Sequence, residues 1–196
     1  MLILASRSPI RKALLAGAGI GFEAKSADVN ERAIEAAAAR ENASPAEIAQ
    51  RLAEAKALAV GGAAVIGADQ VLELDGTILH KPDDAEAARR RLDVLRGRTH
   101  LLHSGIAVAV DGVLVWSGVE TSRLTMRAFP DAERDAYLLA EGDAALGSVG
   151  AYLYEGRGIR LFERVEGDYA SILGLPLLPL LAALRRHVPD VLKGFT

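Results

Sequence analysis

The junction after residues 2–5 carries the first side chains that could do chemistry. The apolar run LILA ends at Ser6, and Ser8 precedes a proline, a pair that favours the start of a helix. A helix N-terminus presents unpaired backbone N–H groups and a partial positive charge, which suits an anion. The two serine hydroxyls and the Arg11 guanidinium add donors suited to phosphate. The junction therefore predicts a phosphate-binding site, because a capping turn alone would need only one such side chain.

A carboxylate, Asp69, interrupts the apolar run AVIGADQVLEL at residues 64–74. An ionised side chain there is costly unless it is paired, binds a metal or faces a cleft. Glu31 could join it to hold Mg²⁺ through oxygen ligands, and Lys56 and Lys81 could bring positive charge to the same place. Such a set suits hydrolysis of a polyphosphate, in which a carboxylate takes a proton from water. The alternative is that each charge belongs to an unrelated surface pair, and spacing alone leaves that open.

Several other kinds of reactive site are excluded by the sequence. It contains no cysteine, so disulfides and thiolate chemistry are ruled out. His100 and His103 stand without cysteine or a helical HExxH pattern, and they do not predict a zinc site. Neither a G-x-S-x-G nucleophile elbow nor a Walker A loop occurs. Tyr152, Tyr154 and Tyr169 are expected to pack beside the core rather than to form a cofactor site.

Length and composition bound the class of protein. The chain has 196 residues, 51% hydrophobic and 25% charged, which favours one globular domain. Its net charge of -3 argues against binding to a nucleic acid polymer, which would call for a basic domain. The N-terminus has no basic start, and the apolar stretch ASILGLPLLPLLAAL is interrupted by Pro176 and Pro179 and is too short to span a bilayer. We therefore expect a soluble, cytoplasmic protein whose partners are neither a membrane nor a nucleic acid polymer.

Hydrophobic periodicity and turn signals predict the elements that position these residues. Strands are expected at residues 2–5, 22–26, 64–74, 101–110, 113–117 and 121–127. Asp75-Gly76 is a hairpin turn signal, from which the chain is expected to return through ILHKP. Helices are expected at residues 9–16, from 45 onward, and at 84–96, 131–139 and 177–186. Asp131 is expected to cap the helix that it precedes. Because helices and strands mix without strict βαβ alternation, the pattern predicts an α/β fold with a mixed sheet.

The helix that begins after Ser44 carries one of the candidate lysines. Glu47 stands at the capping-box position relative to Ser44. The residues expected on its apolar face are Ile48, Leu52 and Ala59. Lys56 lies at the flank of this stripe rather than on the wet side of the helix. Such a lysine either reaches past the edge of the core into water or serves a site, and the sequence leaves both readings open.

Motifs along the whole chain resemble one family. ASRSPIRKALL, DVNE, RLAEAKA, GADQV, KP, GRTH, SVGAY followed by EG, FERVEGDY and LGLPL occur in the order found in the Maf family of nucleotide pyrophosphatases. The resemblance implies cleavage of a nucleoside triphosphate to the monophosphate and pyrophosphate with a divalent metal such as Mg²⁺, Mn²⁺ or Co²⁺. It implies a single α/β domain over residues 1–196, with a mixed, elongated sheet flanked by helices, similar to inosine triphosphatase. The family is often dimeric, so a homodimer is also expected.

The resemblance also implies roles for individual residues. Asp69 resembles the proposed general base, and Glu31 an acidic residue that assists the metal, so both are expected to be catalytic and metal-binding. Lys81 is expected to be catalytic as well as phosphate-binding. Ser6, Arg11 and Lys56 also match phosphate-binding positions of the family. Ser8 is expected to bind phosphate as well, from its place at the start of the helix. One departure is Asn30, which stands where the family commonly has an acid before Glu31, and this bears on metal affinity.

Three positions distinguish branches of the family and bear on the base. By this resemblance, the UTP/dTTP branch has Arg, Thr and Gln at the positions of Ile10, Gln70 and Glu155. The 7-methyl-GTP branch has an aromatic residue, Gln and Glu at the same positions. The chain therefore favours a guanine-type nucleotide, although Ile10 cannot stack on a methylated, positive guanine as an aromatic would. Two alternatives stay open. The enzyme could prefer UTP or dTTP, or the chain could be a non-catalytic nucleotide-binding regulator of septum formation.

Overall fold

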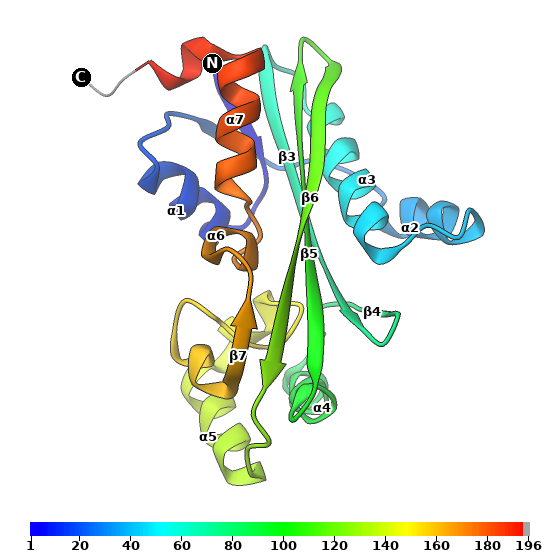
Figure 1. The fold of residues 1–196 in the computed structure, drawn as a ribbon, viewed down its shortest axis with the longest axis vertical. Helices are drawn as coiled ribbons and strands as arrows, with labels where there is room; N and C mark the ends of the chain where they lie inside the picture. The colour runs from blue at the N-terminus through cyan, green and yellow to red at the C-terminus, as the bar shows by residue number, and fades with distance from the viewer. Residues whose placement is uncertain (194–196) are drawn as a thin grey trace. The chain divides into compact units, whose positions relative to one another are not determined.

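The computed structural model, shown in Figure 1, describes residues 1–193 and contains one seven-stranded sheet. Its strands are β1 (Leu2–Ala5), β2 (Glu23–Lys25), β3 (Ala64–Leu74), β4 (Thr77–Leu79), β5 (Thr99–Val110), β6 (Val113–Met126) and β7 (Phe162–Glu166). The strand order is β2-β1-β3-β5-β6-β7, with β4 paired to β3. β1 pairs in parallel with β2 and β3, whereas β3 with β4 and β6 with β7 are antiparallel. The predicted α/β fold with a mixed sheet is confirmed.

Seven α-helices accompany the sheet in the described residues. They are α1 (Pro9–Gly17), α2 (Glu31–Arg40), α3 (Pro45–Leu58), α4 (Ala85–Leu95), α5 (Asp131–Glu141), α6 (Tyr169–Ile172) and α7 (Leu177–His187). Short 3₁₀ segments occur at Gly142–Gly147, Arg157–Leu161 and Pro189–Leu192. Within residues 1–193, no helix combines the length and the apolar character needed to cross a membrane.

The chain divides into two compact units. The first contains Met1–Gln70, Ser104–Glu120 and the chain from Asp168 onward, and the second contains Val71–His103 and Thr121–Gly167. The division falls within β3, β5 and β6, so each of these strands contributes residues to both units.

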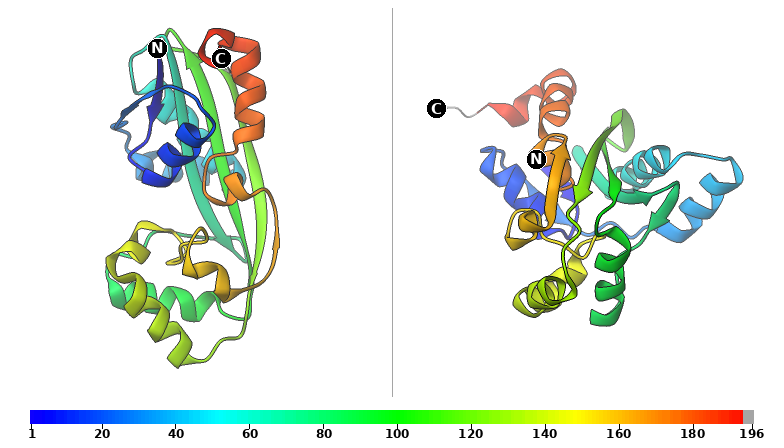
Figure 2. Two further views of the ribbon diagram at one scale, coloured as in Figure 1. Left: turned by 90° about the vertical axis from the view of Figure 1, so that its left-hand side faces the viewer. Right: turned by 60° about the horizontal axis from the view of Figure 1, so that its bottom comes forward.

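In the first unit, α1 and α7 lie on one side of the strands and α3 lies on the other (Figure 1; Figure 2). Strand residues form separate buried clusters with these two helical layers. One cluster joins Ile66 to Leu15 of α1 and Leu184 of α7. A second joins the alanines at 107 and 109 of β5 to Ala53 and Ala57 of α3. Because side chains alternate along a strand, residues 69 and 70 of β3 face different layers.

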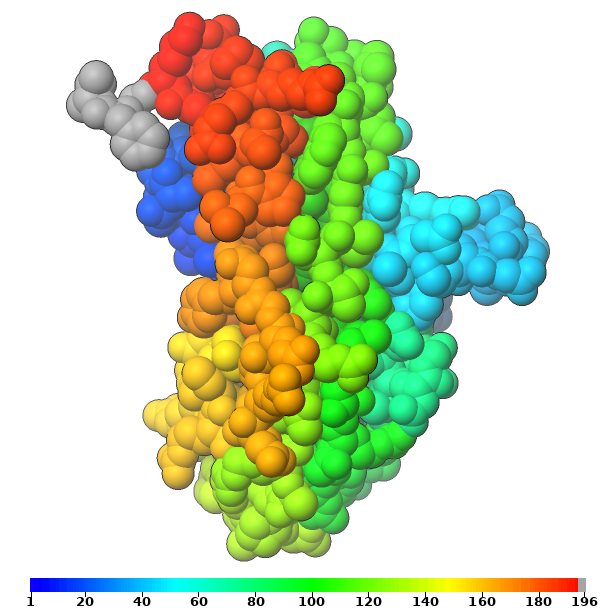
Figure 3. Space-filling model, viewed as in Figure 1, coloured from blue at the N-terminus to red at the C-terminus, as the bar shows by residue number. Residues whose placement is uncertain are grey.

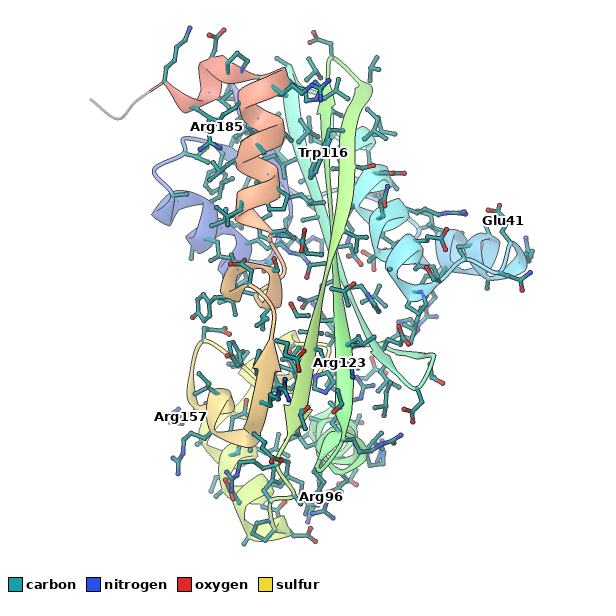
Figure 4. All side chains as sticks on the ribbon, viewed as in Figure 1. Glu41, Arg96, Trp116, Arg123, Arg157 and Arg185 are labelled. Atoms are coloured by element: carbon teal, nitrogen blue, oxygen red, sulfur yellow. The ribbon has the colours of Figure 1, made fainter. Side chains whose placement is uncertain are left out.

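Two predicted strands prove to be one. The sequence predicts strands at residues 113–117 and 121–127, but β6 runs without interruption through both. Gly118 lies under the Trp116 ring, which is labelled in Figure 4, and a Cβ on Gly118 would come within 3.1 Å of that ring. A glycine inside a strand can mark a close approach of this kind rather than a turn.

Two further expectations are corrected by the structure. Asp131 is the first residue of α5 and not its cap, because Pro130 holds the cap position without a side-chain hydrogen bond. The Asp131 carboxylate instead pairs with Arg96 and with the buried Arg134. Tyr169 begins the short α6 and is 52% exposed, so it does not pack beside the core. Tyr152 is buried as expected, and Tyr154 is partly buried with its ring 5.6 Å from that of Phe162.

His100, in the second unit, makes stability depend on pH. It is 1% exposed, its Nε2 lies 2.7 Å from the Tyr152 hydroxyl, and its Nδ1 has no partner among the described residues. Burial lowers the pKa of His100 to about 4. In the unfolded chain the pKa returns to its ordinary value, so the unfolded state takes up the proton first as pH falls. The free energy of unfolding therefore has its full contribution from neutral His100 above about pH 6.5, and this contribution is lost progressively between that pH and 4.

We predict that His100→Asn removes this pH dependence. At pH 5 the folded wild type should have lost about 2 kcal/mol of stability relative to pH 7.5 through His100 alone. The free energy of unfolding, measured in urea at both pH values, should therefore fall less in the variant than in the wild type. His187→Asn, a change in a partly buried histidine at the end of α7, serves as the control. Equal pH slopes in His100→Asn and the wild type would contradict the prediction.

Candidate functional site

The β1–α1 junction lies where parallel strands end. Ala5, the last residue of β1, is in register with Lys25, the last residue of the parallel strand β2, and ligands of open α/β sheets commonly bind beyond the carboxyl ends of such strands. Ser6 Oγ accepts a hydrogen bond from the Ser8 backbone N–H at 3.2 Å, and Ser8 Oγ accepts one from the Arg11 N–H at 3.3 Å. Ser8 is thus the helix cap that the sequence predicts. Each hydroxyl can still donate its own proton to an anion.

Arg11 ties α1 to two other parts of the first unit. Its Nε donates to the Gly174 carbonyl and its Nη1 to the Ala68 carbonyl, both at 2.8 Å. Burial lowers the pKa of the Arg11 guanidinium from its ordinary value, while the negative charges of Asp69 and Glu31 oppose that shift. The sequence predicts a phosphate ligand here but not these carbonyl partners. Arg11 therefore has a structural role, and its contact with phosphate stays a prediction.

Three of the predicted site residues come into direct contact in the first unit. Lys56 Nζ lies 2.5 Å from Asp69 Oδ1 and 2.7 Å from Glu31 Oε1. The side chains of Lys56 and Asp69 are only 14% and 13% exposed, whereas that of Glu31 is 51% exposed. One ammonium group therefore holds two carboxylates from different elements, a mostly buried one on β3 and a more exposed one on α2.

Close packing of α3 on the sheet sets the position of Lys56. A Cβ on Gly67 would lie 2.0 Å from the Ala53 carbonyl oxygen, and one on Gly105 would lie 2.1 Å from the Ala49 carbonyl oxygen. Only glycine permits so close an approach of a helix backbone. The predicted capping box at the start of α3 is present. Ile48 and Leu52 are buried, but Ala59 follows the last helical residue and is exposed, which corrects the predicted apolar face.

Gln70, predicted to bind the base, is engaged within the protein. Its Nε2 donates to Ser104 Oγ and to the Ile172 carbonyl at 2.9 Å, with the Ser171 carbonyl at 3.3 Å. Carbonyl oxygens only accept, so this end of the amide is the nitrogen. Gln70 and its neighbour Asp69 face different helical layers. Gln70 thus positions the segment that carries Ser171 and Ile172, and any contact with the base stays a prediction.

The start of α2 explains one departure from the family pattern. Asn30 caps the helix, because its Oδ1 accepts a hydrogen bond from the Ala33 N–H at 3.1 Å. Asparagine and aspartate are about equally good caps, so the exchange preserves the position of Glu31, the first helical residue. Ile10, the second residue of α1, is partly buried, and its part in choosing the base stays a prediction.

Lys81 and Glu155 belong to the second unit, unlike the other predicted site residues. Lys81 follows β4, and Glu155 is exposed in an irregular segment. Close to Glu155, the Leu153 N–H donates to the Tyr137 hydroxyl at 2.9 Å. The pKa of Tyr137 is raised to about 12, mainly by burial and to a smaller extent by neighbouring negative charge that includes Glu155. The roles of Lys81 and Glu155 stay predictions from the family resemblance.

Comparison with known proteins covers nearly the whole chain. Residues 1–187 match the Maf family, described as Maf-like protein. A 7-methyl-GTP pyrophosphatase of Brucella abortus is 52% identical over 190 residues, which cover 95% of this chain and 96% of that protein. Another of that name, from Rhizobium meliloti, is 49% identical and covers 94% and 95%. A nucleoside triphosphate pyrophosphatase of Nitrobacter winogradskyi is 52% identical and covers 94% and 92%.

Among solved structures, a nucleoside-triphosphatase / dITP/XTP pyrophosphatase of Mycobacterium abscessus is similar with a TM-score of 0.39 and 19% identity. The match covers 66% of this chain and 75% of that one, and it is too distant to carry an argument. The family is shown without that structure, by the match over residues 1–187 and by relatives that are about 50% identical in sequence. On these grounds the chain belongs to the Maf family.

Proposed function

We propose that this protein is a nucleoside triphosphate pyrophosphatase that hydrolyses a guanine-type nucleotide, 7-methyl-GTP in particular, to the monophosphate and pyrophosphate. The observation that carries the proposal is the contact of Lys56 with Asp69 and Glu31. In this contact a carboxylate that could act as the base lies beside a compensating cation, on the unit whose serine-capped α1 suits phosphate. The names of the relatives support the reaction, and those named for 7-methyl-GTP support the base.

In the proposed reaction, a water molecule attacks the α-phosphorus and Asp69 takes one of its protons. A P–O bond forms to the water oxygen, the P–O bond to the bridging oxygen breaks, and pyrophosphate leaves with the electron pair. Lys56 and Arg11 are cations that suit the phosphate oxygens, and the hydroxyls of Ser6 and Ser8 add neutral donors. General-base catalysis by Asp69 is worth about 10²–10⁴-fold in rate.

Asp69 and Glu31 fit the coordination of a divalent cation whose remaining ligands come from the substrate. Lys56 Nζ already lies within 2.7 Å of an oxygen of both Asp69 and Glu31, so two carboxylates surround one positive charge. Residues 1–193 hold no group of three or more His, Cys, Asp or Glu that could bind a metal by themselves. Mg²⁺ is commonly held by one or two carboxylates together with substrate phosphates, so this donor set suffices. When bound, such an ion would neutralise charge on the phosphates.

A panel of nucleotides tests the proposal. GTP, 7-methyl-GTP, UTP, dTTP, CTP and ATP would be incubated with the protein and Mg²⁺ or Mn²⁺, and released pyrophosphate detected with inorganic pyrophosphatase and malachite green. The proposal expects the highest kcat/KM for a guanine nucleotide. Preference for UTP or dTTP would overturn the choice of base. Binding without turnover of any nucleotide would instead indicate a non-catalytic nucleotide-binding protein.

We predict that Glu155→Gln shifts the choice of base. Guanine presents two donors on its pairing edge, N1–H and the exocyclic amine, which a carboxylate can accept. Uracil and thymine present one N–H between two carbonyls, which suits an amide better. Because a mismatched polar group loses its solvation, the ratio of kcat/KM for 7-methyl-GTP to that for UTP should fall about tenfold.

Kinetics of the wild type and the variant on both nucleotides measure this ratio. Glu163→Gln, an exposed change of the same type in β7, is the matched control and should leave the ratio unchanged. A ratio that is also unchanged in Glu155→Gln would show that Glu155 does not read the base.

A further inference from the structure

Lys56 is held in the first unit by two carboxylates and by the helix that carries it. Its ammonium group contacts Asp69 at 2.5 Å and Glu31 at 2.7 Å. Its backbone belongs to α3, which is fixed against the sheet at Gly67. Four flexible carbons separate this fixed backbone from the charge, so the ammonium group can change partners without movement of the helix.

The carboxylate pair needs positive charge at all times. Asp69 is only 13% exposed on its side chain, and a carboxylate so far removed from water is costly without a counter-ion. Glu31 brings a second negative charge to the same ammonium group, and the two acids would repel each other without it. In the protein without nucleotide, Lys56 supplies the charge that a divalent ion would supply in the complex.

A second ion pair would keep α2 in place if Lys56 released Glu31. Arg51 of α3 donates to Glu41, the residue that follows α2, at 2.6 Å. Glu41 is labelled in Figure 4, and Figure 3 shows α2 projecting beyond α3 on this face of the first unit. The two helices are thus joined at both ends of α2, by Lys56 with Glu31 and by Arg51 with Glu41. Only the first of these pairs involves the predicted metal ligands.

We propose that Lys56 is a built-in counter-ion, which holds the Asp69 and Glu31 carboxylates in the free protein and releases them when a metal–nucleotide complex binds. This inference rests on the proposed function and concerns the order of binding. An ammonium group and a divalent cation repel each other and compete for the same oxygens. The metal alone therefore binds weakly, because nothing compensates Lys56 for its lost partners. A nucleotide supplies phosphate oxygens both to the ion and to Lys56, so the metal and the nucleotide bind cooperatively.

Binding of Mn²⁺ to the nucleotide-free protein tests this role without measuring turnover. Free Mn²⁺ would be followed by electron paramagnetic resonance during titration of the wild type and of Lys56→Met. Removing the competing ammonium should tighten Mn²⁺ binding by about tenfold or more. Arg51→Met is the matched control, because it removes one cation from α3 and one α2–α3 ion pair but frees neither Asp69 nor Glu31. It should bind Mn²⁺ like the wild type.

Two outcomes would overturn the proposal. Equal Mn²⁺ affinity of Lys56→Met and the wild type would show that Lys56 only fastens the helices. A gain of Mn²⁺ affinity in Arg51→Met as large as that in Lys56→Met would show a general effect of net charge. In the double variant Lys56→Met/Asp69→Asn, the gain should disappear.

Should Lys56→Met fail to fold, the wild type supplies the same test. The Mn²⁺ that α,β-methylene-GTP binds by itself is measured in a titration without protein and subtracted. The protein should then bind Mn²⁺ at least about tenfold more tightly with the analogue present than without it, and equal affinities would overturn the proposal. The nucleotide panel tests the proposed function separately. A wild type that hydrolyses no nucleotide, with a gain of Mn²⁺ affinity in Lys56→Met, would refute the function and leave the counter-ion role standing.

Discussion

Asp69→Asn is expected to lower kcat for nucleotide hydrolysis by about 10²–10⁴-fold while nucleotide binding persists. Asparagine has nearly the shape of aspartate but cannot take a proton from water at neutral pH. We expect the loss of catalysis without a loss of nucleotide binding, because Lys56 keeps its contact with Glu31 when the charge on Asp69 is removed. The measurement is kcat at saturating metal, together with the affinity for α,β-methylene-GTP from calorimetry.

Loss of a partly buried ion pair can also destabilise the protein, so the folded fraction of the variant is measured by circular dichroism. Asp190→Asn, an exposed change in the same unit whose carboxylate pairs with Lys193, is the control and should keep full activity. A folded Asp69→Asn protein with a nearly wild-type rate would show that Asp69 is not the base.

Gly67→Ala is expected to cost about 3 kcal/mol of stability and most of the activity. The new Cβ would lie 2.0 Å from the Ala53 carbonyl oxygen and 2.5 Å from the Ala57 nitrogen, and both of these are backbone atoms that cannot rotate away. Helix α3 must therefore shift from the sheet. Because Lys56 lies on the same helix, its contact with Asp69 should loosen at the same time.

Gly61→Ala is the matched control for this prediction. A Cβ on Gly61 would meet nothing within 4 Å, so its stability should change by less than about 1 kcal/mol. Urea denaturation gives the free energy of unfolding of each variant, and kcat/KM on the preferred nucleotide gives the activity. Equal stability of the Gly67→Ala and Gly61→Ala proteins would contradict the close packing of α3 that positions Lys56.

Local signals in the sequence predict much of the fold. The apolar run at residues 64–74 predicts the bounds of β3, and Asp75-Gly76 predicts the turn that joins it to β4. The serine–proline starts at Ser8 and Ser44 predict two helices with their caps. These predictions are correct because capping and strand periodicity depend on residues only a few positions apart in the sequence. The contact of Lys56 with Asp69 agrees with the expectation that a charge within an apolar run needs a partner.

Long-range contacts account for what the sequence does not predict. The amide of Gln70 donates to the Ile172 carbonyl, and the guanidinium of Arg11 donates to the Gly174 carbonyl. These partners lie more than 100 positions away along the chain, and a backbone carbonyl leaves no signal in residue type. The same holds for Gly67, whose need for glycine comes from α3 and not from a turn. Charge and side-chain type therefore indicate a phosphate site, but not which donors the fold itself already uses.

Hydrolysis in ¹⁸O-labelled water tests the central claim most directly. The protein would be incubated with 7-methyl-GTP and a divalent metal in that water, and the products separated and analysed by mass spectrometry. If water attacks the α-phosphorus, one ¹⁸O atom enters 7-methyl-GMP and the pyrophosphate carries none. Label in the pyrophosphate would contradict attack of water on the α-phosphorus. Release of 7-methyl-GDP with inorganic phosphate would contradict the assignment of this protein as a nucleoside triphosphate pyrophosphatase.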